Sequence, residues 1–318
     1  MFTMTLRQQN TRLLTVSAAL CIALTTTVNG SAAAASAEPE PTGQVVAWGS
    51  NYYGQSTPPA SVQSGVTAVS GGLSHALALK DGVPIAWGND SMDKLFVPIE
   101  LRRGGVTAIS AGNDHSLAVK NGKVWSWGEF TEPGSFLAPP PGTESGVSAV
   151  SAGYLHSLAL KDGKVIAWGY GSHGETRVPS AAESGVDAIS AGMYFSLALK
   201  NGEVLCWGPN NFGECNVPEE AMAGVTAIAA GSTFTLALKN GRVIGWGNNN
   251  YHQLDMPIEV DDHVVAISAG SQHSLALKDN GEVIGWWYDK QGQSTVPTVA
   301  KSGVSIISAG GYFNLAVK

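Results

Sequence analysis

The sequence predicts an all-β protein, a seven-bladed β-propeller whose blades have about 40 residues and four short strands each. Three observations predict it. Tryptophan recurs every 39 to 41 residues, Gly-containing turns separate short apolar runs, and the two ends of the chain complete one repeat between them. Four strands in ~40 residues, repeated around a ring, are the plan of a propeller.

Each repeat has two halves that recur in step. The tryptophans of the first half, six of them followed by Gly, are Trp48, Trp87, Trp127, Trp168, Trp207, Trp246 and Trp286. The second half resembles Gly-Val-x-Ala-Ile-Ser-Ala-Gly-x-x-His-Ser-Leu-Ala-Leu-Lys, and its copies end at Lys80, Lys120, Lys161, Lys200, Lys239, Lys278 and Lys318. Seven copies of both halves predict seven blades.

The elements of one repeat follow from its apolar runs. Extended runs cover 186–190, 196–200 and 204–207, and a fourth surrounds Val217. The Asn-Gly between the second and third runs is a strong hairpin-turn signal. We therefore expect four strands per blade.

The chain ends predict how the ring closes. Residues 45–48 form a third strand with no first or second strand before them, and residues 305–318 supply a first and second strand with no third after them. We expect these segments to share one blade, which removes the exposed edges of an open array.

The first 37 residues have the three parts of a secretory signal peptide. Arg7 and Arg12 precede an apolar run too short to span a bilayer, and small residues lead to a cleavage point after Ala37. We expect residues 38–42 to be a short linker, residues 43–318 to be the propeller, and the mature protein to be secreted, unanchored and monomeric.

Composition excludes several classes. The chain is 44% hydrophobic, contains 39 glycines and carries a formal charge of −7. Disorder requires fewer apolar residues, a helical bundle tolerates little glycine, and nucleic-acid binding favours a basic surface. We therefore expect a globular β protein without a nucleic-acid partner.

Two cysteines, Cys206 and Cys215, remain after the leader and flank one loop. An exported protein permits a disulfide, and their near-mirrored positions suit a cross-strand pair in a hairpin. Two free thiols are the alternative.

Repeated positions are expected to serve the scaffold, so the Trp-Gly tryptophans pack and do not bind. His75, His115, His156 and His273 occupy a position that Phe takes in other repeats, which indicates a structural role and no metal site. No nucleophile, phosphate-loop or metalloprotease motif is present. We expect a protein that is not an enzyme and needs no cofactor.

The variable positions lie after Ala-Gly and after Trp-Gly, in loops that we expect on one face. These loops contain all eight tyrosines, with Phe130, Phe212, Met92 and many asparagines. Tyrosine normally favours strands, so its confinement to loops indicates a protein-binding surface, since Tyr and Asn on supported loops are typical of paratopes. The alternatives are capping of the blade ends and a glycan-binding face. Acidic loop residues either form a solvated rim or match a basic partner.

The repeats resemble those of the regulator-of-chromosome-condensation type over about residues 43–318. Within that group, the segments 178–189 and 196–204 look like the type II β-lactamase inhibitory protein family. That resemblance implies a secreted propeller whose aromatic loop face clamps a class A β-lactamase, or a related penicillin-binding enzyme, and blocks substrate access. A nucleotide-exchange factor for a small GTPase is a competing function that the export signal and the acidic charge disfavour.

The resemblance also implies contact residues in the loops that the tyrosines single out. Tyr194, Asn211, Phe212, Tyr251, Tyr53 and Asn113 match the family by position. Together with neighbouring loop residues they give the predicted partner-binding set: Tyr52, Tyr53, Asn113, Asp114, Tyr154, Tyr170, Tyr194, Asn211, Phe212, Tyr251, Tyr288 and Tyr312.

The sequence departs from the family at four places. Leu73-Ser74 replaces an expected aromatic pair, and Leu155 follows Tyr154 where a Trp is expected. The loop 129–141 is longer and rich in proline, and Trp287 replaces a turn glycine, so we expect the loop 288–291 to be displaced.

Overall fold

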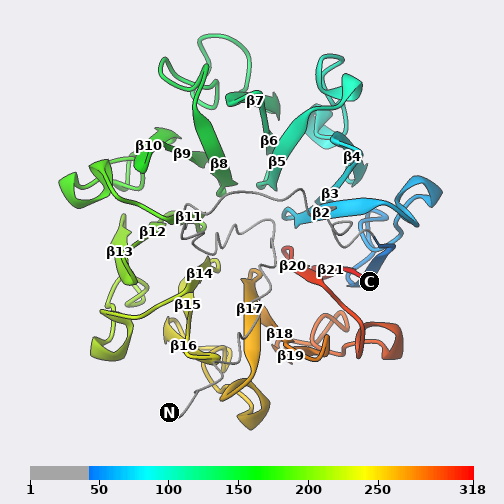
Figure 1. Ribbon diagram of the computed structural model, residues 1–318, viewed down its shortest axis with the longest axis vertical. Coiled ribbons are helices and arrows are strands. Elements are labelled where there is room, and N and C mark those ends of the chain that lie inside the picture. Colours follow the sequence, from blue (N-terminus) through cyan, green and yellow to red (C-terminus); the bar gives the residue numbers. More distant parts are fainter. Residues whose placement is uncertain (1–42) are drawn as a thin grey trace, which may run out of the picture.

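Seven three-stranded antiparallel sheets stand in a ring in the computed structural model, which describes residues 43–318 (Figure 1). The fold is the all-β, seven-bladed propeller that the repeat predicts. The predicted signal peptide and the linker 38–42 lie outside the described residues. We number the blades 1 to 7 in chain order, beginning with the sheet β2-β3-β4.

Each blade has an inner, a middle and an outer strand. The inner strands point toward the centre of the ring in Figure 1 and are β2 (Val66–Gly71), β5 (Val106–Ala111), β8 (Val147–Ala152), β11 (Ala188–Ala191), β14 (Ala227–Ala230), β17 (Val264–Ala269) and β20 (Ile306–Ala309). The middle strands are β3 (His75–Lys80), β6 (His115–Lys120), β9 (His156–Lys161), β12 (Ser196–Lys200), β15 (Phe234–Lys239), β18 (His273–Lys278) and β21 (Phe313–Val317). The outer strands are β4 (Val83–Gly88), β7 (Lys123–Gly128), β10 (Lys164–Gly169), β13 (Glu203–Trp207), β16 (Arg242–Gly247), β19 (Val283–Trp287) and β1 (Val45–Gly49).

Blade 7 closes the ring with both ends of the described chain. Strand β1 pairs with β21, and β21 pairs with β20, so the sheet order is β1-β21-β20. The register places Val45 opposite Val317 and Gly49 opposite Phe313. The prediction that N- and C-terminal strands share one blade is confirmed.

The expected fourth strand is wrong, since every sheet in residues 43–318 has three strands. The segment around Val217 runs extended without ladder pairing and leads through Pro218 into a single 3-10 turn. Proline lacks the N–H that a ladder needs, and its fixed φ suits the start of a helical turn. The 3-10 turns are η1 (Ala60–Val62), η2 (Ser91–Asp93), η3 (Leu101–Arg103), η4 (Ser180–Glu183), η5 (Glu219–Ala221), η6 (Ile258–Val260) and η7 (Thr298–Ala300).

The hydrophobic core lies between neighbouring blades. One cluster joins Phe195 and Leu197 of blade 4 to Ile244 and Trp246 of blade 5, and similar clusters recur around the ring. The tryptophans of the repeat are buried, as their scaffold role predicts. No helix within residues 43–318 is long and apolar enough to span a membrane.

Candidate functional site

Two sets of loops meet at one mouth of the central channel. The loops after the inner strands line a funnel of about 540 Å³, and one loop after an outer strand joins them through Asn248, Tyr251 and Gln253. Backbone hydrogen bonds join the two sets, as in Tyr170 N–H to the Leu155 carbonyl at 2.8 Å. The expectation that the variable loops share one face therefore agrees with this geometry.

Serines around the funnel link successive inner strands. In six of the seven junctions of the described ring, a serine hydroxyl accepts a backbone N–H from the next blade, as Ser151 does from Ala191 at 2.9 Å. The seventh junction has Ala229 at the serine position. The buried hydroxyls satisfy donors that would otherwise be stranded at the strand ends.

The repeated histidines join one blade to the next. The Nε2 atoms of His75, His115 and His156 bond the hydroxyls of Ser116, Ser157 and Ser196 at 2.8 to 3.0 Å, and His273 bonds Asn314 at 2.7 Å. Burial lowers the pKa of His75 and His115 to about 3 and that of His156 and His273 to about 4, so these rings are neutral. Their predicted structural role matches this placement.

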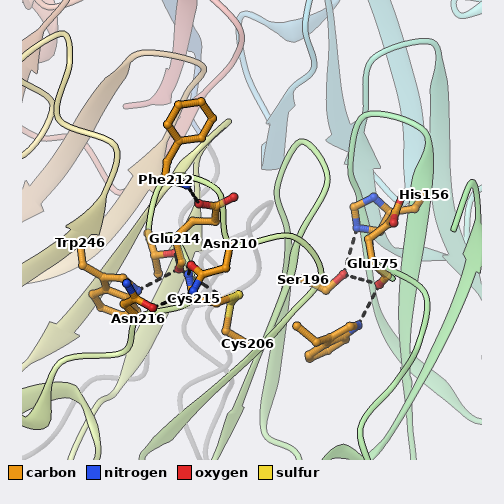
Figure 2. Close-up of a disulfide and its surroundings, with 12 residues drawn as sticks. His156, Glu175, Ser196, Cys206, Asn210, Phe212, Glu214, Cys215, Asn216 and Trp246 are labelled. Atoms are coloured by element: carbon orange, nitrogen blue, oxygen red, sulfur yellow. Dashed lines mark hydrogen bonds between the residues drawn. A yellow bond between two sulfur atoms is a disulfide. The ribbon is translucent and has the colours of Figure 1, made fainter. Parts of the chain in front are cut away.

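A buried Gln or Glu fixes each of five variable loops. Its side-chain oxygen accepts the backbone N–H two residues earlier in the chain, as Glu214 does from Phe212 at 2.8 Å and Gln253 from Tyr251 at 2.9 Å (Figure 2). The same contact fixes Tyr53 through Gln55, His173 through Glu175 and Gln291 through Gln293. The exposed residue at the loop tip is thus held by a side chain beneath it.

The same residue also anchors the next blade through its carbonyl. The Glu175 carbonyl accepts the Trp207 indole N–H at 2.8 Å and the Ser196 hydroxyl at 2.9 Å, and the Glu214 carbonyl accepts Trp246 at 2.9 Å (Figure 2). Sequence reasoning missed this position. Its recurrence four residues before a proline was the available signal, at Gln55, Lys94, Glu175, Glu214, Gln253 and Gln293.

A first aromatic cluster bridges blades 3 and 4. The Tyr154 and Tyr194 ring centroids are 5.6 Å apart, and His173 lies 5.3 Å from Tyr194 and 5.9 Å from Tyr170. Burial, followed by the neighbouring tyrosines, raises the pKa of Tyr194, which is therefore a neutral hydroxyl at physiological pH.

A second aromatic cluster spans blades 5, 6 and 7. Tyr288 lies 6.3 Å from Tyr251 and 5.8 Å from Tyr312, and the Lys290 ammonium lies 5.6 Å from the Tyr288 ring centroid. Burial also raises the pKa of Tyr312. Tyr154, Tyr251 and Tyr312 all line the funnel, so the two clusters meet at its mouth.

Four further predicted residues stand outside these clusters. Tyr52 and Tyr53 pack edge to face at 4.9 Å, and Tyr52 is 85% exposed. Asn211 and Phe212 are exposed at the tip of the loop after β13. The structure thus supplies separate aromatic contacts at other points of the rim.

Asn113 and Asp114 differ from the remaining predicted residues because they are engaged internally. The buried Lys94 ammonium lies 3.0 Å from the Asp114 carboxylate, whose other oxygen accepts from the Asn113 amide at 2.6 Å. The Asp114 charge is therefore neutralised within the protein. Asn113 is buried and lines the funnel.

Cys206 and Cys215 form a disulfide with Cα atoms 5.2 Å apart (Figure 2). Cys206 lies in β13, but Cys215 lies in the loop that follows and pairs with no strand. The expected cross-strand hairpin geometry is therefore wrong. The bridge closes the loop that carries Phe212.

The expected displacement of the loop 288–291 is also wrong. That loop keeps the usual contacts, including Gln291 N–H to Gln293 and Ser294 N–H to Asp289 at 2.7 Å. The effect of Trp287 falls on the preceding junction, where the buried Trp286 indole N–H and Ser274 hydroxyl have no partner. At the equivalent Gly247, an added Cβ would lie 3.2 Å from the Cα of Glu214, which is in the loop that anchors that blade.

The fold and the loop face together define a repeat propeller with an aromatic rim. Four of its repeats match the model of the "Regulator of chromosome condensation (RCC1) repeat", at residues 106–132, 147–175, 225–253 and 264–293. The chain is therefore a seven-bladed propeller in which four repeats are similar to RCC1 repeats. No curated protein sequence matches it significantly. No group of three or more potential metal ligands occurs within residues 43–318.

Solved structures of similar fold come from yeast and a plant. Yeast RCC1 (Prp20) bound to Kap60 has a TM-score of 0.71 at 17% identity, covering 100% of this chain and 95% of that chain. Prp20p from Saccharomyces cerevisiae, in a structure described with its binding to Gsp1p and histones, has a TM-score of 0.68 at 17% identity, covering 88% and 92%. The ectodomain of the Arabidopsis thaliana receptor kinase ACR4 has a TM-score of 0.61 at 22% identity, covering 79% and 93%.

Proposed function

We propose that this protein is a non-catalytic, protein-binding propeller that uses the funnel mouth as its binding face. The observation that carries the proposal is the meeting of two aromatic clusters from different blades at one funnel. Tyr154, Tyr194, Tyr251, Tyr288 and Tyr312 offer large amphipathic surfaces. Buried Gln253 and Gln293 hold the loops of Tyr251 and Tyr288 in place. Aromatic anchors on rigid supports are typical of binding hot spots.

We further propose that the partner is a class A β-lactamase or a related penicillin-binding enzyme, and that the mature protein is secreted. The support is the sequence resemblance at 178–189 and 196–204, the leader-like first 37 residues, and the presence of one family-matched contact residue in each cluster, Tyr194 and Tyr251. In this proposal an exposed loop of the enzyme enters the funnel, and the rim blocks the substrate's path.

The direct test is hydrolysis of a chromogenic β-lactam by purified class A β-lactamases while the mature protein is titrated in. Stoichiometric loss of activity is the expected result. The single variants Y194A and Y251A should each weaken inhibition by on the order of 2 kcal/mol, about thirtyfold in Kd, because each removes a central aromatic anchor. The variant T226A is the matched control, because Thr226 lies in the strand-entry segment away from the funnel.

Inhibition that is unchanged in both tyrosine variants would reject the assigned face. Undiminished activity of several class A β-lactamases in the presence of the folded protein would reject the β-lactamase partner. The alternative is then a redirected protein- or glycan-binding face, which binding to a glycan array would favour. The structural neighbour Prp20p is described with Gsp1p and histones. Binding of histones or a small GTPase by this chain would place its function closer to that neighbour.

A further inference from the structure

A second exposed apolar surface lies apart from the tyrosine clusters, on the loops of blades 1 and 2. A groove of about 650 Å³ runs between the segment 93–102 and the segment 126–132. Phe96 and Ile99 line it and are 68% and 64% exposed. Large apolar side chains gathered at one exposed groove are typical of an interaction site.

Phe96 differs from the residue at the same position in four other loops of the ring. That residue is polar there: Thr57, Asn216, Asp255 and Thr295 each bond the Asn or Asp that opens their own loop, at 2.6 to 3.1 Å. In blade 1 the opening residue is Asp90, and the phenyl ring of Phe96 cannot make this bond. The loop has exchanged a stabilising hydrogen bond for an exposed aromatic ring.

The ring of Phe96 is held in position. The Arg102 guanidinium lies 5.3 Å from its centroid, and the Arg102 Nε–H donates to the Val97 carbonyl at 2.9 Å. This cation–π contact and the hydrogen bond orient both side chains before any partner arrives. A surface ordered in advance binds with a smaller entropy loss.

The charges that line the groove have one sign apart from this arginine. Asp93, Glu100 and Glu132 supply three carboxylates, and Arg102 is already engaged with Phe96 and Val97. An occupant with a lysine or arginine would therefore meet complementary charge, and its neighbouring apolar side chain would cover Phe96 and Ile99.

We propose that this groove docks an extended segment of a partner protein, in which a large apolar side chain stands next to a lysine or arginine. The apolar side chain packs on Phe96 and Ile99, and the cation is held by Glu100 and Glu132. The site is separate from the tyrosine clusters and does not depend on β-lactamase binding.

The test is selection of phage-displayed random 12-residue peptides on the purified mature protein, with the variant F96T as the counter-selection target. Selected peptides are then synthesised with a fluorophore and titrated by fluorescence polarisation. Thr occupies the same position in two other loops, so F96T is expected to bond Asp90 and to unfold at a denaturant concentration no lower than the wild type. Loss of peptide binding in F96T would then be due to the missing phenyl ring and not to a folding defect.

The expected peptides contain adjacent apolar and basic residues, bind F96T at least tenfold more weakly, and lose affinity severalfold in E132Q or in 0.5 M NaCl. The variants Y194A and Y251A should leave their affinity unchanged. Peptides that bind wild type and F96T equally, or that lack basic residues, overturn the proposal. Self-association in analytical ultracentrifugation that F96T abolishes would also overturn it, because a second copy of the chain would then be the occupant.

Discussion

Two junctions between blades differ in how many of their buried polar groups are hydrogen-bonded. At the junction of blades 3 and 4, His156 bonds Ser196, and the Ser196 hydroxyl and the Trp207 indole N–H donate to the Glu175 carbonyl (Figure 2). The Ser151 hydroxyl accepts the Ala191 N–H. At the junction of blades 5 and 6, the same four contacts are absent. Phe234 replaces the histidine, Ala229 replaces the serine, and Ser274 and Trp286 have no acceptor.

Aromatic packing replaces the lost bonds at the second junction. Trp287 packs edge to face on Phe234 at 5.5 Å and lies 6.1 Å from Trp286. The comparison shows that one ring can join its blades either through a buried polar network or through rings. The second kind of junction lies beneath the loop of Tyr251, one of the proposed anchors.

The largest expected difference between the two kinds of junction is their response to acid. The pKa of His156 and His273 is about 4 in the fold and that of His75 and His115 about 3, against 6.5 when unfolded, so the unfolded chain takes up protons first. Stability is therefore full above pH 6.5 and falls as the pH decreases toward 4. At about 1.4 kcal/mol per pH unit, each histidine loses about 2 kcal/mol by pH 5, and the four lose about 8 kcal/mol.

Urea unfolding at pH 7.5 and pH 5.0 measures this loss. The variant H156F copies the phenylalanine junctions and should reduce the acid loss by about 2 kcal/mol. An acid response identical in wild type and H156F would show that this histidine is not the group that titrates.

The second-largest difference in stability between the two kinds of junction is expected at the glycine that follows the repeated tryptophan. Gly208 has φ +110°, and a Cβ there would meet the Tyr194 carbonyl oxygen at 2.8 Å. We expect G208W, which copies Trp287 into blade 4, to lower the free energy of unfolding by about 3 kcal/mol or more, because strain and lost bonds add.

The matched control is G54A. Gly54 also has positive φ, at +80°, but nothing lies within 4 Å of its Cβ position. Its substitution should destabilise by only about 1 kcal/mol. Equal effects of G208W and G54A in denaturant titrations would refute close approach as the reason for the glycine.

Paired serine substitutions give a smaller difference. Ser196→Ala removes the acceptor of the His156 Nε2–H and should destabilise by about 2 kcal/mol, since a buried donor is left unpaired. Ser274→Ala removes a hydroxyl that already has no partner and should change stability by less than about 0.5 kcal/mol. A comparable loss of stability in both variants would contradict the assignment of a hydrogen-bonded Ser196 and an unpaired Ser274.

The sequence predicts the ring well because its signals are repeated seven times. Trp spacing, Gly-containing turns and the split terminal blade all report local patterns that recur, so blade number and closure follow directly. Three of the eight loop tyrosines, Tyr154, Tyr251 and Tyr312, line the funnel, but loops without tyrosine line it as well.

What the sequence could not give depends on contacts between repeats. Whether the segment around Val217 pairs as a fourth strand depends on its backbone path, and no sequence pattern indicates that Lys94 neutralises Asp114. Trp287 was visible as a departure, but the unpaired Trp286 indole and Ser274 hydroxyl at its junction were not. Such outcomes depend on three-dimensional distances between residues that are far apart in the sequence.

The smallest predicted effect is a gain, and it restores one missing contact to the weaker junction. Ala229 is fully buried at the position where six other inner strands carry a serine that accepts an N–H from the next blade. The same geometry places the Ala269 N–H opposite residue 229, so Ala229→Ser should add a hydrogen bond and raise the free energy of unfolding by about 1 kcal/mol. Ser190→Ala at the adjacent junction should lower it by a similar amount. If Ala229→Ser instead destabilises the protein in denaturant titrations, the aromatic packing of Phe234 and Trp287 has shifted the strands enough that this junction no longer follows the geometry of the other six.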